Sequence, residues 1–142
     1  MIEKVRSVQR SFRLSRDTST LLDQLAEATN ESRNALADRL LGEALRTERH
    51  PLIGFRIGAA GRREPYLVGT RLLVRQLVAT VKAHDGNIED AAGYLNVSQR
   101  LLRAALSYYA EFAREINTDT IWAARVEADE RARWEREQAT IA

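Results

Sequence analysis

The sequence predicts a mainly α-helical chain with a few short strands, arranged in three parts, 1–46, 50–116 and 117–142. Residues alternate between apolar and polar over 7–14, as is typical of a strand. Apolar residues recur at helical spacing through most of the remaining chain. Clusters of glycine and proline divide the middle part into short segments, as turns do. At 142 residues the chain has room for one domain or two small ones.

The strand over 7–14 needs a partner, because a single strand leaves its backbone N–H and C=O groups unpaired. The same strand of a second copy would complete a two-stranded ribbon and make the chain a homodimer. Such a ribbon is narrow enough for the DNA major groove. On its polar face, Arg13 would bind guanine, Gln9 adenine, and Ser11 either base. The apolar face consists of Val8, Phe12 and Leu14.

Two amphipathic helices follow the strand. Ser15 is expected to cap the first helix and Asn30 to end it in left-handed conformation, and Ser32 is expected to cap the second. The apolar stripes of the two helices are Leu21, Leu22, Leu25 and Ala28, then Leu36, Leu40, Leu41, Ala44 and Leu45. A helix N-terminus attracts anions, so we expect Ser32, Arg33 and Asn34 to bind a DNA phosphate.

The middle part is expected to begin after a polar linker over 46–51 that ends in proline. Two short strands, 52–57 and 65–68, flank a turn over 58–61. A helix follows, ended by Asp-Gly-Asn at 85–87. Its apolar residues are Val74, Leu77, Val78 and Val81.

The stretch from Ile88 to Ser98 predicts a helix-turn-helix: a helix over 88–95, a tight turn, and a longer helix capped by Ser98. The longer helix is expected to bury Leu101, Leu102, Ala105, Leu106, Tyr109 and Phe112. Three polar residues on its outer face could form a second DNA contact: Gln99, Arg100 and Arg103. A helical hairpin that serves packing alone has the same pattern, so both interpretations stay open.

The third part follows an expected break at 117–119 and favours helix over 120–138 through its Ala, Glu and Arg content. It lacks a strong apolar stripe, and a lone helix of this kind gains stability from a partner. The candidate partner-binding residues are Trp122, Arg125, Val126 and Trp134. The alternatives are a helix that packs on its own dimer and a disordered tail.

Charge is distributed unevenly along the chain. Residues 1–16 carry a net charge of +4 and residues 51–83 a net charge of +5, whereas residues 119–142 carry −2. Two basic zones indicate nucleic acid as a partner of the front of the chain, and a different partner for its end. A solvated surface is the alternative for either zone.

Several classes of chemistry find no support in the sequence. There is no cysteine, and the two histidines, His50 and His84, lie in different segments. We see no metal-binding spacing, nucleophile motif or phosphate loop, so we expect neither an enzyme, nor a cofactor, nor a metal site. No secretory signal and no apolar run near the roughly 20 residues of a membrane span is visible, so a cytoplasmic location without membrane contact is the expectation.

The first part resembles a known family. Gln-Arg-Ser-Phe-Arg-Leu-Ser-Arg-Asp at 9–17 and Asn-Glu-Ser-Arg-Asn at 30–34 are similar to ribbon-helix-helix repressors of the Arc, MetJ and CopG type. The resemblance implies an intertwined dimer, with base contacts at Gln9, Ser11 and Arg13 and phosphate contacts at Ser32 and Arg33. Ser15 stands where the family has proline after the strand. A dimerisation module that never touches DNA is the alternative.

The middle part resembles the domain-of-unknown-function family 433, over about residues 50–116. The matching residues are His50-Pro51 to Phe55, Gly61-Arg62-Arg63, Leu67 to Arg71, and Leu102 to Leu106. The resemblance implies a winged-helix-like, non-enzymatic domain, found in many antitoxins encoded beside a PIN-like ribonuclease toxin, as in VapBC pairs.

Together the resemblances predict a dimeric antitoxin that represses its own operator and masks a toxin through its last part. Arg125, Arg131 and Arg133 could then enter an acidic metal-binding site on the nuclease. A repressor without a toxin and a dimeric interaction scaffold are the alternatives.

Overall fold

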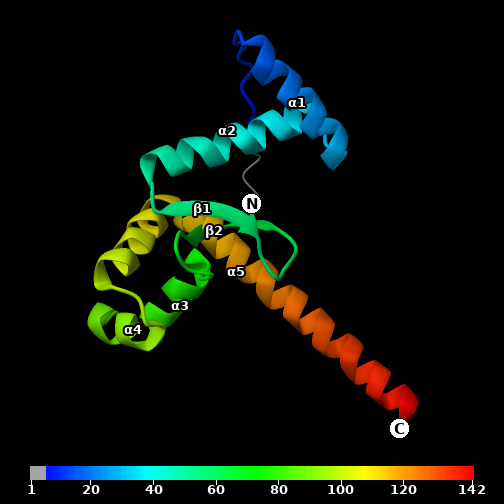
Figure 1. Ribbon diagram of the computed structural model, residues 1–142. Coiled ribbons are helices and arrows are strands. Elements are labelled where there is room, and N and C mark those ends of the chain that lie inside the picture. The colour runs from blue at the N-terminus through cyan, green and yellow to red at the C-terminus, as the bar shows by residue number, and fades with distance from the viewer. Residues whose placement is uncertain (1–5) are drawn as a thin grey trace. The chain divides into compact units, whose positions relative to one another are not determined.

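A computed structural model describes residues 6–142 as a mainly helical chain with one two-stranded sheet (Figure 1). This confirms the predicted class, mainly α with short β. The described chain divides into two compact units, one ending at Gly42 and the other beginning at Glu43. Within residues 6–142, none of the helices combines the length and the apolar character needed to cross a membrane.

The first unit contains helix α1 (Arg16–Thr29) and most of helix α2 (Arg33–Arg49). Both predicted N-caps form: the Ser15 hydroxyl accepts the Thr18 N–H, and the Ser32 hydroxyl accepts the Ala35 N–H, each at 3.1 Å. Asn30 ends α1 with φ of 55°, the left-handed conformation that its side chain tolerates well. The expected starts of both helices and the end of α1 are therefore confirmed.

Residues 6–15 have no regular secondary structure, so the strand expected over 7–14 is not formed in the single chain. Its apolar residues lie open to solvent, with Val8 79% exposed and Phe12 66% exposed. A strand is defined by its ladder of hydrogen bonds, and no other segment of residues 6–142 pairs with residues 7–14. The paired ribbon remains a prediction about two chains.

Helix α2 continues through most of the stretch expected to be a linker, and that expectation is wrong. Arg46 pairs with Glu115 at 2.5 Å, and both Arg49 and His50 pair with Glu111. These contacts hold the last turns of α2 on the second unit, and no helix-breaking residue occurs before Pro51. The boundary between units falls after Gly42, inside α2, rather than after residue 46.

The second unit opens with the antiparallel hairpin of β1 (Ile53–Ile57) and β2 (Arg63–Leu67), in which Ile53 pairs with Leu67 and Ile57 with Arg63. Both strands were expected, although β2 begins at Arg63 rather than Pro65. Gly61 lies in the connecting turn with φ of +79°, a conformation that disfavours any side chain.

Three helices complete the second unit: α3 (Val74–Ala83), α4 (Ile88–Leu95) and α5 (Gln99–Ile141). They pack on one another, and both α3 and α5 contact the hairpin (Figure 1). The core is the side-chain cluster between them: Ile53, Leu67, Val74, Leu77, Val78, Val81, Ala91, Ala92, Leu102, Ala105, Tyr108 and Ile116. The apolar stripe predicted for α3 is entirely buried, because that helix lies in the middle of the unit.

Helix α5 spans 43 residues, about 65 Å at 1.5 Å per residue. The break expected at 117–119 is wrong. Ile116 is only 1% exposed, so it anchors the helix there, and Asn117 accepts a hydrogen bond at 2.9 Å from the hydroxyl of Tyr109, about two helical turns earlier. The departure from helical geometry occurs instead at Phe112, with φ of −118° and ψ of 34°.

Candidate nucleic-acid interface

The residues predicted to contact bases lie on the segment that leads into α1. Gln9, Ser11 and Arg13 are all exposed, and no strand fixes the direction of their side chains within one chain. Arg13 also lines the edge of an apolar groove on the first unit. The three residues are thus accessible, and no regular structure gives them a common orientation within one chain.

The apolar groove lies between this segment, α1 and α2, and its volume is about 670 Å³. It is lined by Phe12, Arg13, Leu14, Thr18, Leu21, Leu22, Leu25, Ala37, Leu40 and Leu41. Within residues 6–42 only Ala26 and Leu36 are buried, whereas Leu21 is 64% exposed and Leu41 is 50% exposed. A unit of this size with so small a core gains stability from a partner that covers the groove.

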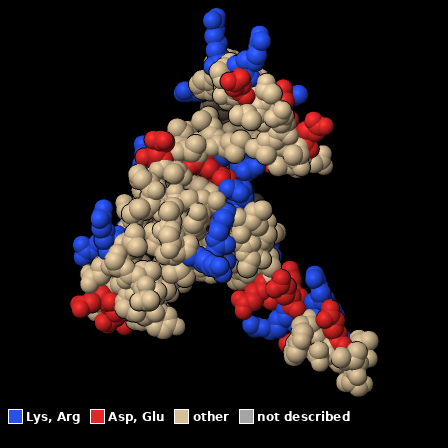
Figure 2. Space-filling view, viewed as in Figure 1, with Lys and Arg blue, Asp and Glu red and all other residues tan. Residues whose placement is uncertain are grey.

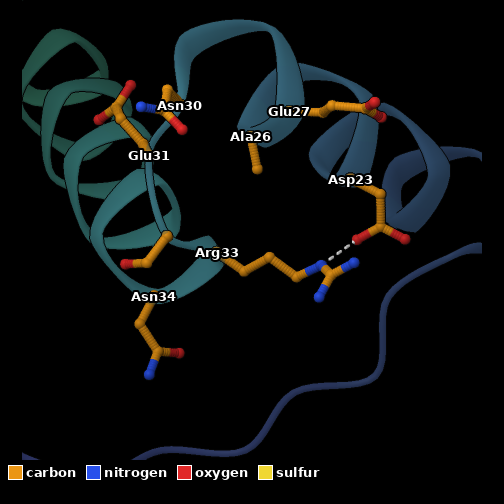
Figure 3. A pocket seen from close by; sticks show the side chains of 8 residues that line it. Asp23, Ala26, Glu27, Asn30, Glu31, Arg33 and Asn34 are labelled. Carbon is orange, nitrogen blue, oxygen red and sulfur yellow. Dashed lines mark hydrogen bonds and ion pairs between the residues drawn. The ribbon is translucent and has the colours of Figure 1, made fainter.

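The residues predicted to contact phosphate surround a second pocket, at the turn between α1 and α2, with a volume of about 710 Å³. Figure 3 shows Arg33 reaching across this pocket to Asp23, with Asn34 beside it and Asn30 and Glu31 at the turn. The Arg33 Nε lies 2.5 Å from the Asp23 Oδ1. Ser32, Arg33 and Asn34 lie together at the start of α2, and their binding of phosphate stays a prediction.

Carboxylates limit what this helix start can bind. Three carboxylates line the pocket: Asp23, Glu27 and Glu31. Of these, Glu31 accepts two hydrogen bonds from the Arg39 guanidinium, at 3.2 and 2.8 Å. The ion pair between Arg33 and Asp23 is exposed, at 70% and 51% for the two side chains, and pairs of this kind contribute about 0–1 kcal/mol. A phosphate at the Ser32 helix start would compete with Asp23 for Arg33.

The helix over 88–95, the tight turn after it and the longer helix capped by Ser98 form as predicted. Asn96 turns the chain with φ of 55°, and the Ser98 hydroxyl accepts the Leu101 N–H at 3.2 Å. Ala92 and Leu102 are buried where α4 meets α5. The small side chain of Ala92 suits a close approach of the two helices. The predicted second DNA contact is exposed on the first turns of α5: Gln99, Arg100 and Arg103.

Most cations of the basic zone 51–83 have partners inside the chain. Arg63 pairs with Glu43, Arg75 with Glu64, and Arg62 with Asp119. Arg56 donates to the backbone carbonyl of Arg71. The Arg71 side chain itself is exposed. Most of these cations therefore stabilise the fold, and the net charge of the zone overstates the positive charge available to a ligand.

Gly69 has φ of +87°, a backbone conformation that glycine adopts readily and that residues with a side chain rarely adopt.

Sequence reasoning missed two buried residues of the second unit. Glu64 is 2% exposed; its Oε1 accepts the Arg75 Nε–H at 2.6 Å, and its Oε2 has no hydrogen-bond partner among residues 6–142. Tyr108 is fully buried, and burial, together with nearby Glu115, raises the pKa of its hydroxyl. Glu64 is the only acidic residue of a basic segment, and Tyr108 lies at helical spacing from Ala105; both signals were available.

The candidate partner-binding residues fall into two groups. Trp122 contacts its own unit: its Nε1–H donates to the Ala60 carbonyl at 3.3 Å, and the Arg62 guanidinium lies 5.2 Å from its ring centre. Arg125 and Trp134 are exposed, and Val126 is half-buried on α5. Figure 2 shows acidic and basic side chains interleaved along the far end of this helix.

Comparison with known proteins finds no match: no family model, no curated protein and no solved structure is similar to this chain. Both family resemblances therefore stay predictions. In residues 6–142, no group of three or more histidine, aspartate or glutamate side chains is arranged to hold a metal ion.

Proposed function

We propose that this chain is the antitoxin of a type II toxin–antitoxin pair: a homodimeric, DNA-binding autorepressor that also neutralises a PIN-like ribonuclease toxin. The observation that carries the proposal is the open apolar groove of the first unit. Phe12 and Leu14, from the unpaired segment 6–15, line this groove together with leucines of α1 and α2. An unpaired segment beside an uncovered groove is what one half of an intertwined ribbon dimer would present.

Electrostatics supports DNA as the ligand of this dimer. Arg10, Arg13 and Arg16 are exposed on or beside the unpaired segment, and dimerisation would double their number. Arginine donates two parallel hydrogen bonds to guanine or to phosphate, so exposed arginines on a ribbon are suited to a DNA groove. The exposed Gln99, Arg100 and Arg103 would provide a second contact with the same duplex.

A gel-shift assay on the DNA upstream of the gene tests the DNA-binding part. Arg13→Ala is expected to weaken specific binding by about 1–3 kcal/mol, because one bidentate base contact is lost. Arg131→Ala, which removes an exposed arginine from α5, is the matched control and is expected to bind as the native chain does. Affinity should also fall steeply with salt concentration. Equal binding by the Arg13 variant, or no binding by the native chain, would contradict the proposal.

Co-purification with the product of the adjacent gene tests the toxin-binding part. The far end of α5 is exposed and is available for a partner. Deleting residues 127–142 removes helix beyond the contacts of Trp122, and is expected to abolish toxin neutralisation while DNA binding persists. A truncated chain that still protects cells from the toxin would count against this part.

A repressor without a toxin is the second candidate. The exposed polar face at the start of α5 favours it, because a second DNA contact has a use in a repressor whether or not a toxin is bound. A native chain that binds its upstream DNA and captures no product of a neighbouring gene would select this candidate.

A further inference from the structure

The second half of α5 is attached to its unit by few contacts. Ile116 is buried in the core, and Glu115 pairs with Arg46. Farther along, Asp119 and Trp122 contact the turn of the hairpin. Residues 127–142 are exposed apart from half-buried Ala132.

The turn contacts converge on one arginine. The Arg62 Nη2 lies 3.9 Å from the Asp119 Oδ1, and the same guanidinium lies over the Trp122 ring, 5.2 Å from its centre. The Trp122 indole also donates to the Ala60 carbonyl at 3.3 Å. Each contact is weak by itself, because the ion pair is long and both Arg62 and Trp122 are partly exposed.

The helix also has a point at which it can bend. Phe112 departs from helical φ and ψ, and its ring is held by neighbours on both sides: Tyr108 at 4.7 Å and His50 at 5.9 Å between ring centres, and the Arg46 guanidinium at 4.9 Å. Ile116, beyond this bend, is 1% exposed and belongs to the core, so residues 99–116 stay with the packed unit and only the helix after Ile116 projects from it.

We propose that α5 beyond Ile116 is an arm, latched onto the β1–β2 turn when Arg62 and Ala60 hold Asp119 and Trp122. The latch sets the direction in which the exposed end of the helix leaves the unit, and its opening frees the arm from Asp119 onward. This device does not require DNA or toxin binding, so its test is independent of the proposed function. It also assigns Trp122 to the chain's own fold, and leaves Trp134 as the accessible tryptophan of the arm.

The environment of Asp119 favours a latch that can open, because it disfavours the ionised carboxylate that pairs with Arg62. Burial, followed by the nearby negative charge of Glu64, raises the pKa of the Asp119 carboxyl, and Arg62 only partly offsets this. Ionised Asp119 is thus held at a cost, which lowers the energy needed to release it.

Hydrogen exchange of the full-length chain tests the latch. Arg62→Ala removes the partner of both Asp119 and Trp122, and is expected to speed amide exchange over residues 117–126 about five- to tenfold. Exchange over 99–116 and in α3 should not change. Arg71→Ala, which removes an exposed arginine close by in the sequence, is the control and should leave residues 117–126 as they are.

A second measurement uses fluorescence. The chain has two tryptophans, so Trp134→Phe leaves Trp122 as the only source of tryptophan fluorescence. In that background Arg62→Ala should shift Trp122 emission to the red and make it more sensitive to a soluble quencher, and Arg62→Lys should have a smaller effect. Unchanged exchange over 117–126 together with unchanged Trp122 emission would overturn the proposal. Equal loosening of α3, α4 and α5 would also overturn it, because the arm would then not move as a separate element.

Discussion

The buried ion pair of Glu64 with Arg75 offers the sharpest test of the second unit. Glu64 is 2% exposed and the Arg75 side chain 17% exposed, and their hydrogen bond is 2.6 Å long. Arg75→Ala would leave a carboxylate in the protein interior without its cation. Removing one partner of a buried pair costs about 3–5 kcal/mol of folding free energy.

The unfolding free energy of Arg75→Ala should therefore lie about 3–5 kcal/mol below the native value at pH 7, because the Glu64 carboxylate stays buried without its cation.

Urea denaturation at pH 7 measures this difference. Glu64→Gln combined with Arg75→Ala should recover part of the stability, since no buried charge remains. Arg131→Ala breaks an ion pair whose side chains are 68% and 72% exposed, and should cost no more than about 0.5 kcal/mol. A loss below about 1 kcal/mol in Arg75→Ala, or no recovery in the double variant, would refute the assignment of Glu64 to a buried, charge-dependent site.

Two further predictions concern single residues of α5. Ser98→Ala removes the hydroxyl that accepts the Leu101 N–H, and should lower the unfolding free energy of the second unit by about 1 kcal/mol in the same denaturation assay, whereas Ser98→Asp should not. For Asp119, burial raises the pKa from its ordinary value of 3.8, the negative charges of Glu64 and Glu115 raise it further, and Arg62 and Arg75 oppose them. A raised acid pKa contributes stability below the ordinary value that is lost as pH rises through the raised value. As the pH rises from 4 to 7, the unfolding free energy of Asp119→Asn should therefore increase relative to that of the native chain. Parallel pH profiles of the two chains would contradict this.

Local signals in the sequence determined most of the elements. Ser15, Ser32 and Ser98 cap helices because a hydroxyl next to three unpaired N–H groups satisfies one of them whatever the tertiary context. Asn30 and Asn96 end helices because asparagine tolerates the left-handed conformation. The apolar stripe of α3 and the turn at 58–61 were predictable for the same reason: each depends on neighbours in the sequence.

The two wrong boundaries depended on residues far away in the sequence. Polar residues over 46–51 resemble a linker until Glu111 and Glu115 are known to face Arg46, Arg49 and His50. Helix α5 continues past 117–119 because Ile116 enters a core built by other elements and the hairpin turn receives Trp122. No local pattern carries that information.

The candidate site divides in the same way. The sequence by itself determined which residues could read DNA, because Gln9, Ser11 and Arg13 need only alternation to share a face, and Gln99, Arg100 and Arg103 need only helical spacing. Tertiary structure alone decided which charges are free. It paired Arg75 with the buried Glu64 and set Arg62 between Asp119 and Trp122, because packing brings together groups that lie far apart along the chain and burial makes an unpaired charge too costly to keep.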